Sequence, residues 1–258
     1  MNEIKLLSVK YLQDKTKLRE IDYWLKVMGR AQGWHYDMDI VWILSELEKA
    51  GIKKGATILD AGGGLGITQF ILAARGYNVI SLDFSKRKIP ILAHGVFDIK
   101  IEDQEDLDYD HDYMGSVDYK ESNNSLVNKS NSILKSLNNF LFNKTFVQKT
   151  SIINNFFDSR ETLKLNNIEK EKNNSNYGSI TFLRASFHDI PMSNGSVDAL
   201  VSVSAIEHAD KKLMLKNHNE MVRVVKKGGP LLISTSASNS KDDTFDEKTL
   251  GWCFSLNS

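Results

Sequence analysis

The sequence predicts an α/β protein with a mostly parallel sheet and helices on both faces. First, residues 57–82 follow the order strand, glycine turn, helix and strand. Second, short apolar runs of the kind found in buried parallel strands return at 180–183, 199–203 and 231–233. Third, a helical pattern at 213–225, ended by Gly228 and Gly229, separates the last two runs. Alternation of this kind is typical of βαβ units in a parallel sheet.

Composition narrows the functional classes. The chain has 258 residues, and its 33 Lys and Arg balance its 33 Asp and Glu. This zero net charge disfavours a globally basic nucleic-acid binder and a polybasic membrane-surface protein. The single cysteine, Cys253, excludes an internal disulfide and a metal site built from a cysteine cluster. No signal peptide or spanning segment is visible, so we expect a cytoplasmic protein.

Two helices are expected before the first strand. At 16–28 apolar residues share one helical face, and a second helical pattern runs from Ile40 to a stop near Gly51. The aromatic residues Trp34, His35 and Tyr36 lie between them, in an expected connector. We expect residues 1–54 to form a helical extension that covers the site as a lid, with these three residues binding the acceptor. Tryptophans on helices also serve as packing residues, which is the simpler interpretation.

Residues 55–258 are expected to form the main domain, with an insertion at about 101–177. The insertion is first acidic and then rich in Asn, Ser and Lys, and its apolar residues recur at helical spacing near 133–141 and 152–157. It is a candidate surface for a protein partner. Its residues Asp110, Asp112, Gly115, Asp118 and Glu121 match an EF-hand loop, but Met114 at position 5 and poor flanking helices argue against calcium, so we assign no metal site.

The strongest signal is the glycine turn after the first strand. Its residues are Asp60, Ala61, Gly62, Gly63, Gly64, Leu65 and Gly66, and a second acid, Asp83, ends the next strand. Glycines let backbone N–H groups approach a ligand, and an acid at the second strand end can accept ribose hydroxyls. The third fingerprint position of dinucleotide sites is Ile67 here, which disfavours NAD, and the turn lacks the Lys of a phosphate-binding P-loop.

Four motifs in order resemble class I S-adenosylmethionine-dependent methyltransferases of the type 11, or methyltransferase domain, family. The first two are LDAGGGLG at 59–66 and VISLDFS at 79–85. The third comprises ASFHDIPM at 185–192, GSVDALVS at 195–202 and IEH at 206–208; the fourth comprises EMVRVVKKGG at 220–229 and LLIST at 231–235. The resemblance implies a three-layer α/β/α, Rossmann-like fold and covers roughly 56–100 and 179–236.

The resemblance also implies a role for each matching residue in binding S-adenosylmethionine. The loop of Gly62, Gly64 and Gly66, with Ala61 and Gly63 beside them, would hold the methionine portion, with Asp60 on its amino-group side. Asp83 would take the ribose hydroxyls, Phe84 and Phe187 would line the adenine, and Ser204 would face the transferable methyl group. Where the family usually has an acid beside the adenine, this chain has Ser186.

Methyl transfer to a hydroxyl or amine benefits from a general base, for which histidine is the commonest residue. His208 is the first candidate, followed by His35, Tyr36 and His188. His208 can equally cap its helix or bind a backbone carbonyl. The acceptor itself, expected to be small or medium-sized, is not specified by these motifs.

Two alternatives remain beside the methyltransferase. One is a non-catalytic cofactor-binding domain whose insertion binds a protein, suggested by Ser186 and by the short C-terminal part. The other is an NAD-dependent oxidoreductase. Only 23 residues follow Thr235, too few for a helix and two further strands of ordinary length, so we expect a shortened sheet or a truncated chain.

Overall fold

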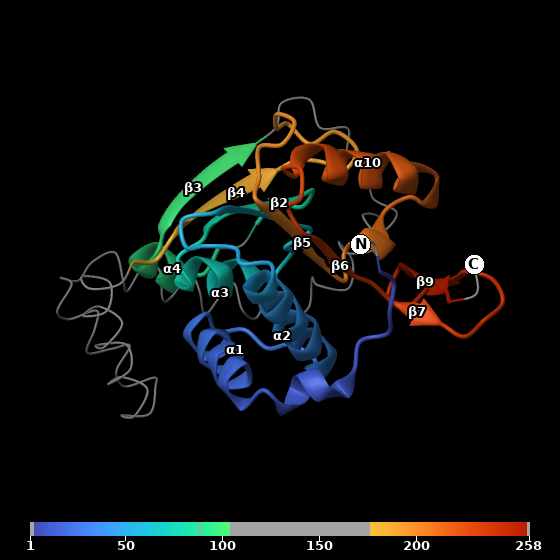
Figure 1. The fold of residues 1–258 in the computed structure, drawn as a ribbon, viewed down its shortest axis with the longest axis horizontal. Coiled ribbons are helices and arrows are strands. Elements are labelled where there is room, and N and C mark those ends of the chain that lie inside the picture. The colour runs from blue at the N-terminus through green and yellow to red at the C-terminus, as the bar shows by residue number, and fades with distance from the viewer. Residues whose placement is uncertain (1–2, 88, 104–175, 257–258) are drawn as a thin grey trace, which may run out of the picture. The chain divides into compact units, whose positions relative to one another are not determined.

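The computed structural model describes residues 3–87, 89–103 and 176–256 (Figure 1). The helices expected near 133–141 and 152–157 and the calcium-like pattern at 110–121 lie outside these residues, as does most of the expected insertion. The account below concerns the described part of the chain.

Six parallel strands form the main sheet, which confirms the predicted fold class. Their order across the sheet is β3-β4-β2-β1-β5-β6. Each predicted apolar run lies in one of them, because a strand covered on both faces must be apolar on both. The strands are β1 (Thr57–Ala61), β2 (Asn78–Asp83), β3 (Asp98–Asp103), β4 (Ser179–Arg184), β5 (Ala199–Val203) and β6 (Leu231–Ser234).

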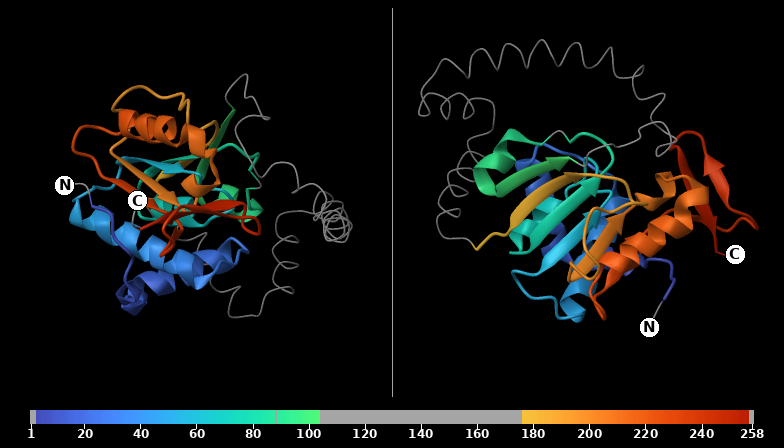
Figure 2. Two further views of the ribbon diagram at one scale, coloured as in Figure 1. Left: turned by 90° about the vertical axis from the view of Figure 1, so that its right-hand side faces the viewer. Right: turned by 90° about the horizontal axis from the view of Figure 1, so that it is seen from above.

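Helices cover both faces of this sheet (Figure 1). One face carries α1 (Lys15–Val27), α2 (Trp34–Lys49) and α3 (Thr68–Ala74), and the other carries α10 (Met214–Val224). The shorter elements are η1 (Val9–Gln13), α4 (Ile91–Val96), η2 (Ile206–His208) and η3 (Lys211–Leu213). The two views of Figure 2 show the same layers from the side and from above.

Aromatic packing joins the first helix layer to the sheet. Phe70 of α3 is fully buried, and its ring centroid lies 6.2 Å from that of Phe182 on β4 and 6.0 Å from that of Phe97. Trp24 of α1 packs on Phe97 at 5.3 Å. The Arg75 guanidinium after α3 pairs with Glu20 of α1 and Glu48 of α2, both at 2.6 Å. These contacts fix the N-terminal helices against the sheet.

Two boundaries differ from the sequence prediction. The prediction that Trp34, His35 and Tyr36 lie in a connector is wrong. They form the first turn of α2, and the extended residue before the helix is Gly33. Residues 101–103, expected in the insertion, belong to β3. This edge strand is exposed along most of its length and carries charges in place of an apolar run, so its sequence lacks the signal of a buried strand.

The C-terminal residues form a separate sheet of three short strands in the order β7-β9-β8. These strands are β7 (Ala237–Ser238), β8 (Thr244–Asp246) and β9 (Gly251–Ser255), and β9 packs against η2. The sequence analysis did not predict them. None of the helices in the described part of the chain is both long and apolar enough to cross a membrane.

Candidate cofactor site

The candidate site lies where the direction of the sheet's connections reverses. β1 pairs with β2 on one side and with β5 on the other, in parallel on both sides. The segments that follow β1 and β5 therefore separate at the carboxyl ends of the strands. Open α/β sheets bind ligands in the crevice at this point.

The glycine turn is closed by backbone hydrogen bonds. The amides of Gly62 and Gly63 donate to the Leu82 carbonyl at 2.7 and 3.3 Å, and Gly66 N donates to the Gly63 carbonyl at 2.9 Å. Gly62 has φ of +78°, and a Cβ on it would lie 2.3 Å from the Cβ of Ala205 and 2.9 Å from the Phe187 ring. The structure thus brings the turn against the segments that follow β4 and β5.

Asp83 stands beside the turn at the end of β2. Its carboxylate accepts hydrogen bonds from Gly64 N at 2.9 Å and from Ser85 N at 2.7 Å. A carboxylate has about four acceptor positions, so roughly two remain for other donors. These remaining acceptor positions, and the place of Asp83 at the strand end, fit the two hydroxyls of a ribose.

Asp60 lies beneath the turn, where it is buried with 1% of its surface exposed. The Ser81 hydroxyl donates to its carboxylate at 3.1 Å. Burial raises the pKa of Asp60 to about 6, against the opposing effects of the Arg87 charge and the Ser81 hydrogen bond. The carboxylate expected on the amino-group side of a ligand thus has protein partners of its own, and a direct ligand contact stays a prediction.

Two arginines that the sequence analysis did not single out bind the turn. Arg87 donates to the Gly64 carbonyl and Arg30 donates to the Leu65 carbonyl. Arg87 follows Asp83 by four residues, but Arg30 comes from the segment between α1 and α2. No spacing pattern links Arg30 to residue 65, so only the fold reveals the contact.

The remaining predicted cofactor residues lie at the ends of β2, β4 and β5. The Phe84 carbonyl accepts from Arg184 Nε at 3.3 Å. The Ser186 hydroxyl bonds His188 Nδ1 at 2.8 Å, so the residue that replaces the usual acid already has a side-chain partner. Ser204 follows β5 with φ of +47°, an uncommon conformation for a residue with a Cβ.

A buried polar cluster lies between the start of α2 and η2. The Glu207 side chain is 2% exposed and accepts from Thr235 Oγ1 at 3.2 Å. Burial and, secondarily, the Glu207 charge raise the pKa of Asp39 to about 6, while the nearby Ser234 hydroxyl opposes the shift. Burial and the charges of Glu207 and Asp39 likewise raise the pKa of Tyr36. A role for Tyr36 in acceptor binding stays a prediction.

The other two aromatic candidates are more exposed. Trp34 is 63% exposed and packs edge-on against His35, with ring centroids 6.0 Å apart. The His35 ring in turn lies 4.2 Å from the Tyr36 ring. A role for Trp34 and His35 in acceptor binding stays a prediction.

His208 contacts the C-terminal sheet. Its Nδ1 lies 2.9 Å from the Leu250 carbonyl, and a Cβ on Gly251 would lie 3.1 Å from its ring. A carbonyl can only accept, so Nδ1 carries a proton, and in the neutral form of the ring Nε2 would hold the lone pair that a base needs. The contact is thus compatible with both the structural and the catalytic interpretation.

Two variants of His208 separate its structural contact from its ring. His208→Ala is expected to lower the free energy of unfolding by about 1 kcal/mol, because it removes one hydrogen bond. His208→Asn, whose amide can still donate to Leu250, should lose less than about half of that amount. Urea unfolding of both variants measures the difference, and equal losses would show that the hydrogen bond does not stabilise the fold.

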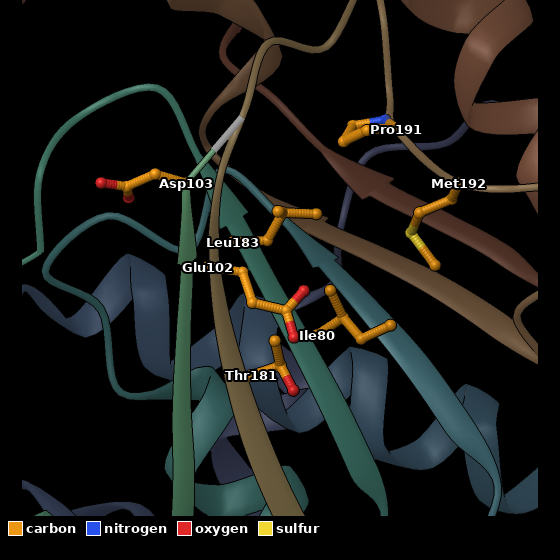
Figure 3. A pocket seen from close by; sticks show the side chains of 7 residues that line it. All are labelled: Ile80, Glu102, Asp103, Thr181, Leu183, Pro191 and Met192. Carbon is orange, nitrogen blue, oxygen red and sulfur yellow. The ribbon is translucent and has the colours of Figure 1, made fainter. Parts of the chain in front are cut away.

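A separate hollow of about 340 Å³ opens on the sheet (Figure 3). Figure 3 shows Ile80, Thr181 and Leu183 along its floor, with Glu102 and Asp103 on β3 and Pro191 and Met192 opposite. None of the predicted site residues lines it. The hollow is therefore not the predicted cofactor site.

Comparison with known proteins finds a family that matches part of the chain. Residues 158–233 match the family described as methyltransferase domain. These 76 residues are less than a third of the chain, and they are similar to that family. The matched segment contains β4, β5 and all of β6 except its last residue, and the parallel sheet with helices on both faces is the three-layer α/β/α arrangement that the motifs predicted.

Solved structures of similar proteins include several methyltransferase candidates. A candidate S-adenosyl-L-methionine-dependent methyltransferase of Methanococcus maripaludis is 15% identical with a TM-score of 0.38, covering 92% of this chain and 68% of its own. A candidate methyltransferase from an antibiotic biosynthesis pathway of Anabaena variabilis is 14% identical with a TM-score of 0.38, covering 77% and 46%. A third structure is a Haloferax volcanii complex of the Trm112 methyltransferase activator with a candidate methyltransferase. It is 14% identical with a TM-score of 0.36, covering 91% of this chain and 62% of its own.

The chain thus spans about half to two thirds of the length of these structures. The similarities carry no information about an acceptor. No curated protein sequence matches the chain.

Proposed function

We propose that this protein is a methyltransferase that binds S-adenosylmethionine at the glycine turn and transfers its methyl group to a small or medium-sized acceptor. The observation that carries the proposal is the joint position of Asp83 and the glycine turn at the reversal point of the sheet, where Gly64 N and Asp83 are 2.9 Å apart. A nucleoside with a charged amino-acid tail needs a carboxylate that accepts hydrogen bonds from its ribose hydroxyls. It also needs, beside that carboxylate, a backbone that the tail can approach closely. This arrangement supplies both.

The protein's part in such a reaction is to bind and orient. S-adenosylmethionine supplies an electrophilic methyl group when bound. Asp83 accepts the ribose hydroxyls, Phe187 and Phe84 enclose the adenine, and Ser204 lies at the methyl end. Residues 1–54 act as the lid on the acceptor side, where Tyr36 is near Glu207. His208 is the proposed base, through Nε2, for an acceptor that must lose a proton.

The buried position of Ile67 argues against a dinucleotide. Ile67 is 1% exposed and stands where the dinucleotide fingerprint requires a small residue for close packing of helix and strand. Its side chain is part of the core instead. NAD is therefore not the proposed cofactor.

Replacing Asp83 tests the cofactor assignment. Asp83→Ala is expected to weaken S-adenosylmethionine binding about 10- to 100-fold, because hydrogen bonds to a charged acceptor are lost. Isothermal titration calorimetry measures the affinity. Asp98→Ala, which removes an exposed carboxylate at the amino end of β3, is the matched control and should bind like the wild type. Unchanged affinity in Asp83→Ala would refute the assignment.

A non-catalytic cofactor-binding domain is the second candidate, because Ser186 replaces the usual acid and its hydroxyl already bonds His188. Incubation with S-adenosylmethionine and a panel of amine, hydroxyl and thiol acceptors separates the two. Formation of S-adenosylhomocysteine supports the enzyme. Tight cofactor binding without turnover of any acceptor class supports the second candidate.

A further inference from the structure

The backbone amides of the glycine turn are almost all used within the protein. Gly62 N and Gly63 N donate to Leu82, Gly64 N donates to Asp83, and Gly66 N donates to Gly63. Among the described residues, the amide of Leu65 has no such acceptor. Leu65 itself is 56% exposed, so this part of the turn is open to solvent.

The direction of that amide is set by the carbonyl before it. A peptide unit is planar and trans, so the N–H of one residue points opposite to the C=O of the preceding residue. Arg87 Nη1 donates to the Gly64 carbonyl. The N–H of Leu65 consequently points away from Arg87.

Arg87 is fixed where it makes this contact. Its side chain is 8% exposed, its Nη2 donates to Ser81 Oγ at 3.1 Å, and its guanidinium lies 5.8 Å from the Phe182 ring centroid. The carboxylate of Asp83 is 3.9 Å from Nη2. The planar fork of arginine can bind the carbonyl and the hydroxyl at the same time, which a single ammonium group does less well.

We propose that Arg87 is a positioning residue that aims the Leu65 amide at an anionic ligand group, which the proposed function identifies as the carboxylate of the cofactor's methionine portion. Arg87 does not touch the ligand, since it binds the opposite side of the turn. The inference rests on the proposed function for the identity of the ligand. The orientation of the amide itself follows from the hydrogen bonds of the turn.

Two ligands that share the adenosine portion test this role. S-adenosylhomocysteine carries the amino-acid carboxylate, and 5′-methylthioadenosine lacks the amino-acid portion. Arg87→Met is expected to weaken binding of S-adenosylhomocysteine about tenfold, the usual effect of one hydrogen bond to a charged group, and binding of 5′-methylthioadenosine less than twofold. Calorimetry with the full chain measures both affinities.

Two further variants complete the experiment. Arg19→Met makes the same chemical change at an exposed position of α1 and should bind both ligands like the wild type. Arg87→Lys keeps one donor and should regain most of the affinity for S-adenosylhomocysteine. If Arg87→Met does not fold, Arg87→Lys tests the inference instead. A smaller loss of affinity for S-adenosylhomocysteine than in Arg87→Met, without a matching loss for 5′-methylthioadenosine, is still expected in that variant.

The outcomes are distinct. A selective loss for the carboxylate-bearing ligand supports the inference. An equal loss for both ligands means that Arg87 only supports the fold or Asp83, and no loss means that the amide needs no positioning; either result overturns the inference and leaves the proposed function standing. A wild-type protein that binds neither ligand overturns both.

Discussion

Gly62→Ala is expected to abolish measurable cofactor binding and to lower the free energy of unfolding by roughly 2–4 kcal/mol. Gly62 has φ of +78°, which costs a residue with a Cβ about 1 kcal/mol. The new methyl group would also lie 2.3 Å from the Cβ of Ala205, far inside van der Waals contact. The turn or the segment after β5 must therefore move, and both belong to the proposed site.

Gly55→Ala is the matched control for this variant. Gly55 has φ of +83°, but nothing lies within 4 Å of a Cβ placed on it. The control isolates the backbone cost, so it should lose about 1 kcal/mol and keep normal cofactor binding. Urea unfolding and calorimetry on both variants measure the two effects. If Gly62→Ala and Gly55→Ala had the same stability and the same affinity for the cofactor, the close contact between the glycine turn and Ala205 would be contradicted.

Asp39→Asn is expected to stabilise the protein at neutral pH and to have little effect near pH 4. The pKa of Asp39 in the folded state is raised from 3.8 to about 6, chiefly by burial. The unfolded chain therefore releases this proton at a lower pH than the folded protein does. The contribution of Asp39 to the free energy of unfolding is therefore fully present below pH 4. It falls by about 3 kcal/mol in total as the pH rises through about 6.

Asparagine removes the charge and keeps a similar shape, so most of that loss should be recovered at pH 7.5. Urea unfolding at pH 4 and at pH 7.5 gives the measurement. Asp22→Asn, at an exposed position of α1 paired with Lys26, is the control and should change stability by less than about 0.5 kcal/mol. Since Asp60 shows a shift in the same direction, part of the pH dependence will persist in Asp39→Asn. A variant that is no more stable than the wild type at pH 7.5 would contradict the burial of an ionised Asp39.

The sequence predicted those elements whose physical signal is local. Strands β1, β2, β4, β5 and β6 are covered on both faces, so their apolar runs are visible without any tertiary information. Edge strand β3 was missed because Ile101 is 64% exposed among charged neighbours, and nothing in such a segment distinguishes a strand from a loop. The start of α2 was missed because the glycine before Trp34 was interpreted as part of a connector.

The sequence predicts where the site residues lie relative to the strands, but not all of the side-chain contacts that they make. The motifs place Gly62, Asp83 and Ser204 after parallel strands, and parallel strands bring their carboxyl ends to one edge. The contacts of Arg30 and Arg87 depend on side-chain paths between separate elements. Asp60 lies on the opposite face of β1 from its neighbours Leu59 and Ala61, which pack in the core cluster with Met221, since strand residues alternate between faces.

The order of strands in the sheet also has a consequence for synthesis, in which the chain emerges amino end first. The backbone of Thr57 beside β1 bonds Asp198 beside β5, 141 residues later in the sequence. Until that segment has been made, β1 has a neighbour on one side only, and the glycine turn lacks its contact with Ala205. The glycine turn is made well before the segment after β5, so its contact with Ala205 can form only when nearly four fifths of these 258 residues have been translated.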